Sequence, residues 1–148
     1  MKKPGDIFKQ ITLIHLAICI ATALIIGIIY TIKSKSGEVV SSEIGWDILE
    51  IIVPVTAVLT FAVAYYFGKS RYKKVQASDS LESKLDVYRL NNIVLWAALE
   101  GSAFFGGIAF YLSGRTNILL YSLMMGVLLI YFRPLKSRAI EDLKLSPE

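Results

Sequence analysis

The residue whose type and position most suggest chemistry is Glu100, an acid in the middle of the apolar stretch 94–112. An ionised carboxylate at the centre of a membrane costs about 3 kcal/mol on insertion scales, so such residues face a bundle interior or a polar path. Three interpretations remain open. Glu100 could be a protonated, hydrogen-bonded clamp between helices, a site that binds and releases a proton or cation, or a polar contact for assembly with another protein.

His15 is the second candidate for binding an ion or a proton, because an imidazole can change its charge near neutral pH. It lies about 9 Å from the centre of its helix at 1.5 Å per residue, so direct contact with Glu100 is not expected. A lone histidine among Leu, Ile and Ala is also a common structural residue. Trp96, four residues before Glu100, could offer its indole N–H to the acid.

The other side chains offer little catalytic chemistry. The chain has one His and one Cys, Cys19, and no closely spaced set of metal-ligating residues. No strand is predicted, so no glycine-rich phosphate loop follows one. We therefore predict no enzyme activity, no metal and no cofactor.

Long uncharged stretches position these residues. Of 148 residues, 55% are apolar, and the mean hydropathy is +0.57. The stretches 10–32, 51–68 and 116–132 carry no charge, and Glu100 is the only charged residue in 90–114. A helix needs about 20 apolar residues to cross a hydrocarbon core about 30 Å thick. The sequence therefore predicts an all-α, membrane-spanning bundle of four transmembrane helices, arranged as two antiparallel hairpins.

The predicted helices cover about 8–33, 46–69, 80–113 and 116–133, and a short amphipathic tail helix covers about 134–144. Together they form a single integral membrane domain. The third helix includes an extension on the cytoplasmic side of the membrane. Asp79 precedes Glu82 by three residues, the spacing of a capping box, and is the candidate N-cap of this helix.

The basic residues predict the orientation. Of the 16 Lys and Arg residues, 13 lie in the N-terminal segment, the central connection and the tail, and three lie in the other two loops. The positive-inside rule then places both termini in the cytoplasm. The net charge of +4 is explained by orientation and by attraction to lipid head groups. We predict no binding to nucleic acid.

Small residues on the third helix predict close helix packing. Ala103 and Gly107 follow Glu100 on one side of the helix, and a second row on another side consists of Ala98, Ser102 and Gly106. Such rows let membrane helices approach one another closely. They could serve contacts within one chain, between copies in a homo-oligomer, or with other membrane subunits.

Pro54 interrupts the hydrogen-bond pattern of the second helix and frees the carbonyl of Glu50. We expect a helix kink in the outer half of the membrane. A freed carbonyl could line an ion path, but we favour ordinary packing as the cause of such a kink. Glu50 itself is expected to reach water outside the membrane.

The stretch "LEGSAFFGGIAFYLSG", followed by "YFRPLKSRAIEDLKL", resembles a group of small bacterial four-helix membrane proteins of unknown activity. The resemblance rests on the pairs Glu100-Gly101, Arg133-Pro134 and Asp142-Leu143. It implies a four-helix fold in the bacterial cytoplasmic (inner) membrane and supplies no substrate.

The third helix is also faintly similar to the rotor-ring proteolipids of rotary ATPases, in which a central carboxylate binds H⁺ or Na⁺. Only Glu100 carries over. Those proteins pair the acid helix with a glycine-repeat helix, whereas the first helix here has a single glycine, Gly27. We regard this second likeness as accidental.

We therefore expect a structural or accessory component of the cytoplasmic membrane, in contact with membrane lipids. The alternative is a small proton- or cation-coupled carrier or channel subunit that uses Glu100.

Overall fold

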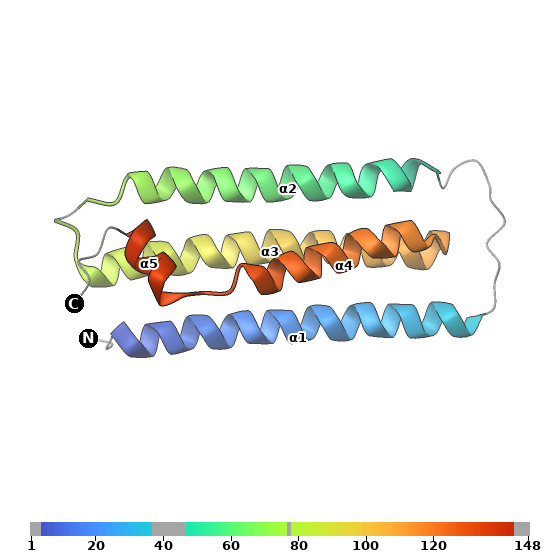
Figure 1. Ribbon diagram of the computed structural model, residues 1–148, viewed down its shortest axis with the longest axis horizontal. Coiled ribbons are helices and arrows are strands. Elements are labelled where there is room, and N and C mark those ends of the chain that lie inside the picture. Colours follow the sequence, from blue (N-terminus) through green and yellow to red (C-terminus); the bar gives the residue numbers. More distant parts are fainter. Residues whose placement is uncertain (1–3, 37–46, 77, 144–148) are drawn as a thin grey trace.

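The computed structural model describes residues 4–36, 47–76 and 78–143 (Figure 1). This part of the chain forms five α-helices and contains no strand. The helices are α1 (Pro4–Ser36), α2 (Asp47–Lys73), α3 (Leu81–Ser113), α4 (Thr116–Tyr131) and α5 (Lys136–Asp142). The predicted all-α class is confirmed. The first predicted helix is longer at both ends in the structure.

Three of these helices are long and apolar enough to cross a membrane: α1, α2 and α3. The pair of α4 and α5 is a fourth candidate, and α5 turns away from α4 by 79°. The prediction of a membrane protein is confirmed at this level. The side chains agree, because Leu13, Leu24 and Ile51 are 68%, 61% and 64% exposed, which suits a surface that faces lipid tails.

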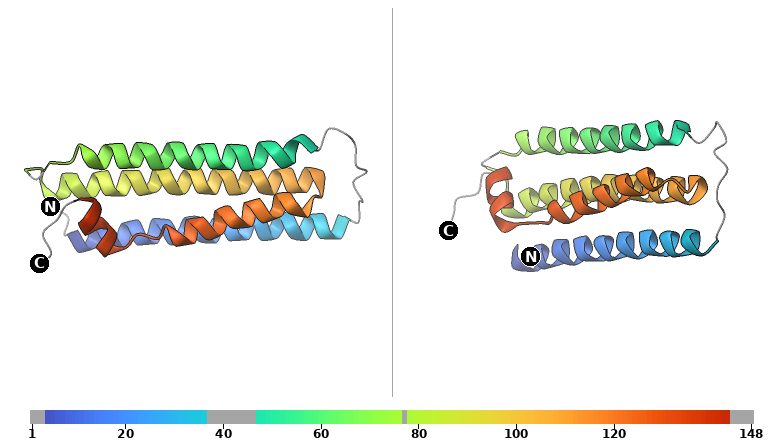
Figure 2. Two further views of the ribbon diagram at one scale, coloured as in Figure 1. Left: turned by 45° about the horizontal axis from the view of Figure 1, so that its top comes forward. Right: turned by 45° about the vertical axis from the view of Figure 1, so that its right-hand side comes forward.

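Helix α3 is the centre of the molecule. Helices α1 and α2 flank it on opposite sides, and α4 packs along it (Figure 1). A second view shows α2 beside α3 and α4 beside α1 (Figure 2). Half of the most apolar 18-residue segment of α3 is buried, whereas the corresponding segments of α1 and α2 are 22% and 17% buried. The packed core therefore follows one side of α3, where Trp96, Leu99 and Ala103 are fully buried.

The structure moves the predicted start of α3 by one residue. Ser80 is the N-cap, and its hydroxyl accepts a hydrogen bond from the backbone N–H of Ser83 at 3.2 Å. The prediction that Asp79 caps the helix was wrong. Its carboxylate instead accepts from the N–H of Gln76 at 2.7 Å and so closes the preceding turn. At the other end, Gly114 adopts φ 69°, a left-handed conformation that glycine tolerates without strain.

Helix α2 continues through Pro54 as one uninterrupted helix (Figure 1). Near its start, Glu50 forms an ion pair with Arg115 at 3.0 Å, and the two side chains are 33% and 26% exposed. The sequence suggested only that Glu50 reaches water, but the side chain also forms this ion pair. It ties the start of α2 to the turn between α3 and α4.

Helix α4 ends at Tyr131, shortly before Pro134, which has no backbone N–H to continue the pattern. The chain then turns into α5, whose residue Ala139 is buried together with Leu143 just after the helix. The Tyr88 hydroxyl donates to the Leu135 carbonyl at 3.3 Å. These contacts hold the tail helix against the first turns of α3. We call this end of the molecule, where α1 and α3 begin and α5 lies, the basic end.

Candidate functional site

Glu100 lies at the edge of the buried side of α3. Its neighbour Leu99 is fully buried, whereas Gly101 is exposed and Glu100 itself is partly buried. The acid faces the contact with α1, close enough to Cys19 for an electrostatic interaction. It therefore borders the α1–α3 contact without being enclosed by it.

The Glu100 carboxyl has no hydrogen bond and no ion pair to any residue that the structure describes. Within the same residues, no side-chain nitrogen or oxygen is both fully buried and unbonded. The carboxyl oxygens must therefore reach the molecular surface. A clamp between helices of one chain requires a donor on another helix, and the described chain supplies none.

His15 joins α1 to the end of α4. It is buried, and its Nε2 lies 2.9 Å from the carbonyl oxygen of Leu129. A carbonyl oxygen can only accept, so Nε2 carries the hydrogen and donates it. The imidazole also packs on the ring of Trp96, with the ring centroids 4.7 Å apart. These contacts indicate a structural role for His15, and neither of them involves Glu100.

Trp96 makes a matching contact from α3. Its Nε1–H donates to the carbonyl oxygen of Phe132 at 2.9 Å, so it does not make the bond to Glu100 that the sequence left open. The last carbonyls of any helix lack partners within that helix. His15 and Trp96 supply donors to two such carbonyls at the end of α4. The pair therefore caps α4 with side chains from two other helices.

The predicted small residues lie where α3 meets its neighbours. A Cβ added to Gly106 would lie 3.1 Å from the Cβ of Ser122 on α4, and one added to Gly107 would lie 3.1 Å from the Cδ1 of Ile29 on α1. The Ser122 hydroxyl donates to the carbonyl of Ala103 at 2.5 Å. Gly106 thus lies against α4 although Ser102, in the same predicted row, lies against α2, and Gly107 lies against α1.

The other small residues face α2. The Ser102 hydroxyl donates to the carbonyl of Ala98, one turn earlier, at 2.8 Å. It also lies 2.8 Å from the hydroxyl oxygen of Thr60 on α2. One hydroxyl thus bonds within its helix and across to its neighbour. Each side of α3 carries a polar contact as well as a close approach.

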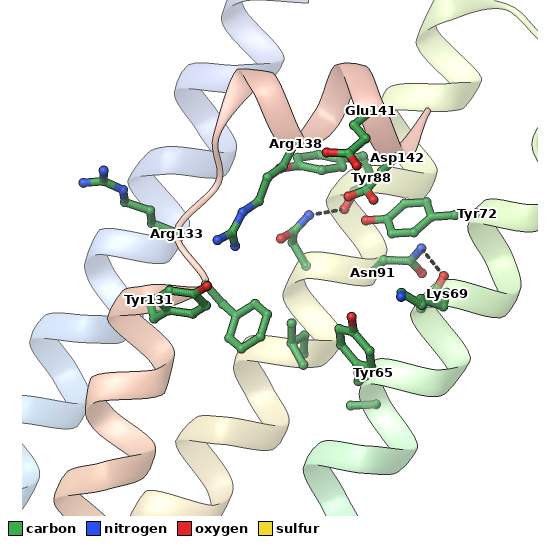
Figure 3. A pocket seen from close by; sticks show the side chains of 15 residues that line it. Tyr65, Lys69, Tyr72, Tyr88, Asn91, Tyr131, Arg133, Arg138, Glu141 and Asp142 are labelled. Atoms are coloured by element: carbon green, nitrogen blue, oxygen red, sulfur yellow. Dashed lines mark hydrogen bonds between the residues drawn. The ribbon is translucent and has the colours of Figure 1, made fainter. Parts of the chain in front are cut away.

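A polar groove of about 400 Å³ lies at the basic end, between α2, α3, the end of α4, and α5 (Figure 3). Its lining includes the basic residues Lys69 and Arg138, the acidic residues Glu141 and Asp142, and the tyrosines Tyr65 and Tyr72. None of these residues was a site candidate on the sequence alone. Basic and aromatic residues at membrane boundaries are expected for orientation alone, so their presence in the sequence gave no signal of a groove.

Aromatic rings hold two of the three basic side chains that line the groove. The Lys69 ammonium lies 5.2 Å from the ring centroid of Tyr65. The Arg138 guanidinium lies 5.1 Å from the ring centroid of Tyr131 and 5.8 Å from that of Phe132. Neither cation forms an ion pair with a residue in the described part of the chain. Both charges therefore remain available for a ligand.

The two acids of the groove are equally unpaired within the described chain. Partial burial, followed by the neighbouring Glu141 carboxylate, raises the pKa of Asp142 above its ordinary value, and Arg138 and Lys69 offset part of this effect. A cationic partner would therefore stabilise the ionised form of the Asp142 carboxyl.

Among the described residues, no group of three or more His, Cys, Asp or Glu side chains is arranged to hold a metal ion. Comparison of the chain with family models, curated proteins and solved structures gives no match. Function must therefore be argued from the arrangement of the residues themselves.

Proposed function

We propose that this chain is an accessory component of the cytoplasmic membrane. In this proposal it binds a transmembrane helix of another protein through the strip of α3 formed by Ala97, Glu100 and Gly101, here called the Glu100 strip. The observation that carries the proposal is the Glu100 carboxyl, which reaches the molecular surface deep within an apolar helix and has no partner in the described chain.

Other polar side chains within the apolar helices behave differently. His15, Trp96 and Ser122 each bond to another helix, as does the pair of Thr60 and Ser102. Polar groups needed for folding are thus satisfied inside the molecule. An ionised carboxylate facing lipid costs about 3 kcal/mol, and a donor from a partner helix would remove that cost.

The surface beside the acid suits a second helix. Ala97 and Gly101 are exposed, and a Cβ added to Gly101 would meet nothing within 4 Å. They line a shallow groove of about 360 Å³ together with Thr56, Thr60 and Phe105. Small residues of this kind allow close approach between membrane helices.

A different protein suits this surface better than a second copy does. The uncharged stretches 10–32, 51–68 and 116–132, together with the remainder of 90–114, contain no Lys or Arg. A second copy therefore has no cation to offer at the depth of Glu100. The proposed partner carries a basic residue, or another strong hydrogen-bond donor, near the middle of a transmembrane helix.

The proposal also places the basic end in the cytoplasm. Lys69, Arg71 and Arg133 lie at this end, and Arg115 lies at the opposite one, so the positive-inside rule supports this orientation. Labelling of single cysteines introduced at Gln76 and at Arg115, in a Cys19→Ser background, tests it. In intact cells a membrane-impermeant reagent should label only the cysteine at Arg115.

Site-specific photo-crosslinking in native membranes tests the proposed assembly. Crosslinkers at Ala97 and Gly101 should give the same heterologous product, whereas control crosslinkers at the outward positions Leu13 and Leu24 should not. Glu100→Leu should lower the yield by about tenfold or more, since losing 1.4 kcal/mol changes an equilibrium tenfold. Replacing the mid-membrane donor of the identified partner should have the same effect.

Two results would refute the assembly proposal. One is an unchanged product yield in the Glu100→Leu variant. The other is a crosslink pattern at Ala97 and Gly101 that contains only lipid or a second copy of the chain. If reconstituted vesicles showed a pH-linked flux that Glu100→Gln abolished, a small proton- or cation-coupled carrier would replace the accessory role.

A further inference from the structure

We propose that the groove at the basic end binds the head group of a phospholipid that carries both a phosphate and a primary amine, as phosphatidylethanolamine does. In this proposal Lys69 and Arg138 bind the phosphate, and Glu141 and Asp142 bind the ammonium. The site does not involve Glu100 and so extends the proposed function without depending on the Glu100 strip.

The groove begins where the apolar part of the helices ends. Its lining includes the buried residues Ala64 on α2 and Leu95 on α3. Ala64 is five residues from Lys69 along α2, and Leu95 is four residues from Asn91 along α3. Both therefore lie about 6–8 Å deeper in the apolar region than those polar residues. An occupant thus meets apolar side chains at its inner end and charges at its outer end, as a lipid at a membrane surface does.

The phosphate position follows from the two cations. Lys69 comes from α2 and Arg138 from α5, and both side chains point into the groove from opposite sides (Figure 3). Arg133 also borders the groove but points away from its centre (Figure 3). An ammonium and a guanidinium form charge-assisted hydrogen bonds to phosphate oxygens. Their contacts with aromatic rings hold both side chains in place before a ligand arrives.

The ammonium position follows from the two acids. Glu141 and Asp142 lie on α5, farther from the apolar spans than Lys69 and the Arg138 guanidinium (Figure 3). In a phospholipid the phosphate is attached to the glycerol and the amine lies beyond it, so the order of charges in the groove matches the order in the head group. Without an ammonium, Asp142 stays in the setting that raises its pKa.

The same charges argue against two other common head groups. A phosphatidylglycerol head group would satisfy the cations, but its hydroxyls bring no positive charge to the two carboxylates. A choline group has no N–H and cannot donate a hydrogen bond to Glu141 or Asp142. The volume of about 400 Å³ lies within the usual range for a small-ligand site, about 300–1,000 Å³.

Native mass spectrometry of the purified, delipidated chain in detergent tests the site. Phosphatidylethanolamine, phosphatidylglycerol and phosphatidylcholine with identical acyl chains are added in turn. We expect retention of the ethanolamine lipid over both others. Lys69→Gln and Arg138→Gln should each weaken this retention by about tenfold, the effect of losing about 1.4 kcal/mol. Arg133→Gln is the matched control and should leave it unchanged.

The acids are tested by a second pair of changes. The double variant Glu141→Gln with Asp142→Asn should keep phospholipid binding but lose the preference for ethanolamine over choline. Soluble phosphoethanolamine and inorganic phosphate separate the two sources of the same chemistry. We expect neither to displace the lipid at equal concentration, because neither contacts the inner apolar lining.

Several results would overturn the site. One is equal retention of the three lipids, and another is a preference for phosphatidylglycerol. A third is an equal loss of lipid retention in the Arg133→Gln and Arg138→Gln variants. The fourth is displacement of the lipid by soluble phosphoethanolamine at equal concentration. Thermal unfolding of each variant identifies those that fail to fold. Glu100→Leu serves as the link to the proposed assembly, since it should leave lipid retention unchanged even if it abolishes the crosslink.

Discussion

Replacing His15 and Trp96 tests whether side chains from two other helices hold the end of α4. His15→Leu removes the donor to the Leu129 carbonyl, and Trp96→Phe removes the donor to the Phe132 carbonyl. His15→Gln is the informative control, because a glutamine keeps an N–H donor but cannot titrate. A capping role predicts that this variant retains most of the wild-type stability.

The expected loss follows from the contacts. A buried acceptor left without a donor costs about 1–3 kcal/mol, but interhelical hydrogen bonds within membranes average only about 0.6 kcal/mol, with a maximum near 1.7. We therefore expect His15→Leu to lower the free energy of unfolding by about 1 kcal/mol. Trp96→Phe should cost about 2 kcal/mol, because it also leaves space beside a fully buried ring.

The two changes should not be additive. The rings of His15 and Trp96 pack at 4.7 Å, and aromatic pairs contribute about 0.5–1.5 kcal/mol beyond their burial. The double variant should thus lose less stability than the two single variants together, by at most that amount, because Trp96→Phe keeps an aromatic ring beside His15. Reversible unfolding in mixed detergent micelles measures all four free energies. A loss below about 0.3 kcal/mol for His15→Leu, or strict additivity, would refute the capping interpretation.

Three further predictions concern other parts of the fold. Gly106→Ala should destabilise the chain by about 1–3 kcal/mol in the same unfolding assay, because its Cβ would meet α4 at 3.1 Å, whereas Gly101→Ala should be neutral. Glu50→Gln should cost less than about 1 kcal/mol, and high salt should shrink this difference, since its ion pair with Arg115 is partly exposed. Because the pKa of Asp142 is raised in the folded state, that state binds more protons, and this contribution to stability is lost as pH rises through the folded-state pKa. In lipid-free detergent, Asp142→Asn should flatten that part of the pH profile, and an unchanged profile would contradict the assignment.

The sequence was sufficient for the elements and for one kind of contact. An uncharged stretch of about 20 residues has few structural alternatives to a membrane helix, so α1, α2 and α3 follow directly from the spacing of charges. The glycines at positions 106 and 107 also stood out, because small residues at helical spacing predict close approach. The residues that they contact, Ser122 and Ile29, could not be predicted, since spacing does not say which helix packs on which row.

The contacts between helices were much harder to predict for a physical reason. In a soluble protein a polar side of a helix marks the surface, but lipid-facing and core-facing sides are both apolar here. Nothing in the sequence therefore indicated that Trp96 would bond to Phe132 rather than to Glu100. The groove at the basic end depends on the turn after Pro134, which carries Arg138 and Asp142 across to Lys69.

The central position of α3 constrains how the chain is made. A ribosome releases α1 and α2 first, yet these two helices lie on opposite sides of α3 rather than against each other. Until α3 enters the bilayer, the two earlier segments lack the helix against which both of them pack. Tertiary assembly of the bundle therefore begins only when the third span arrives.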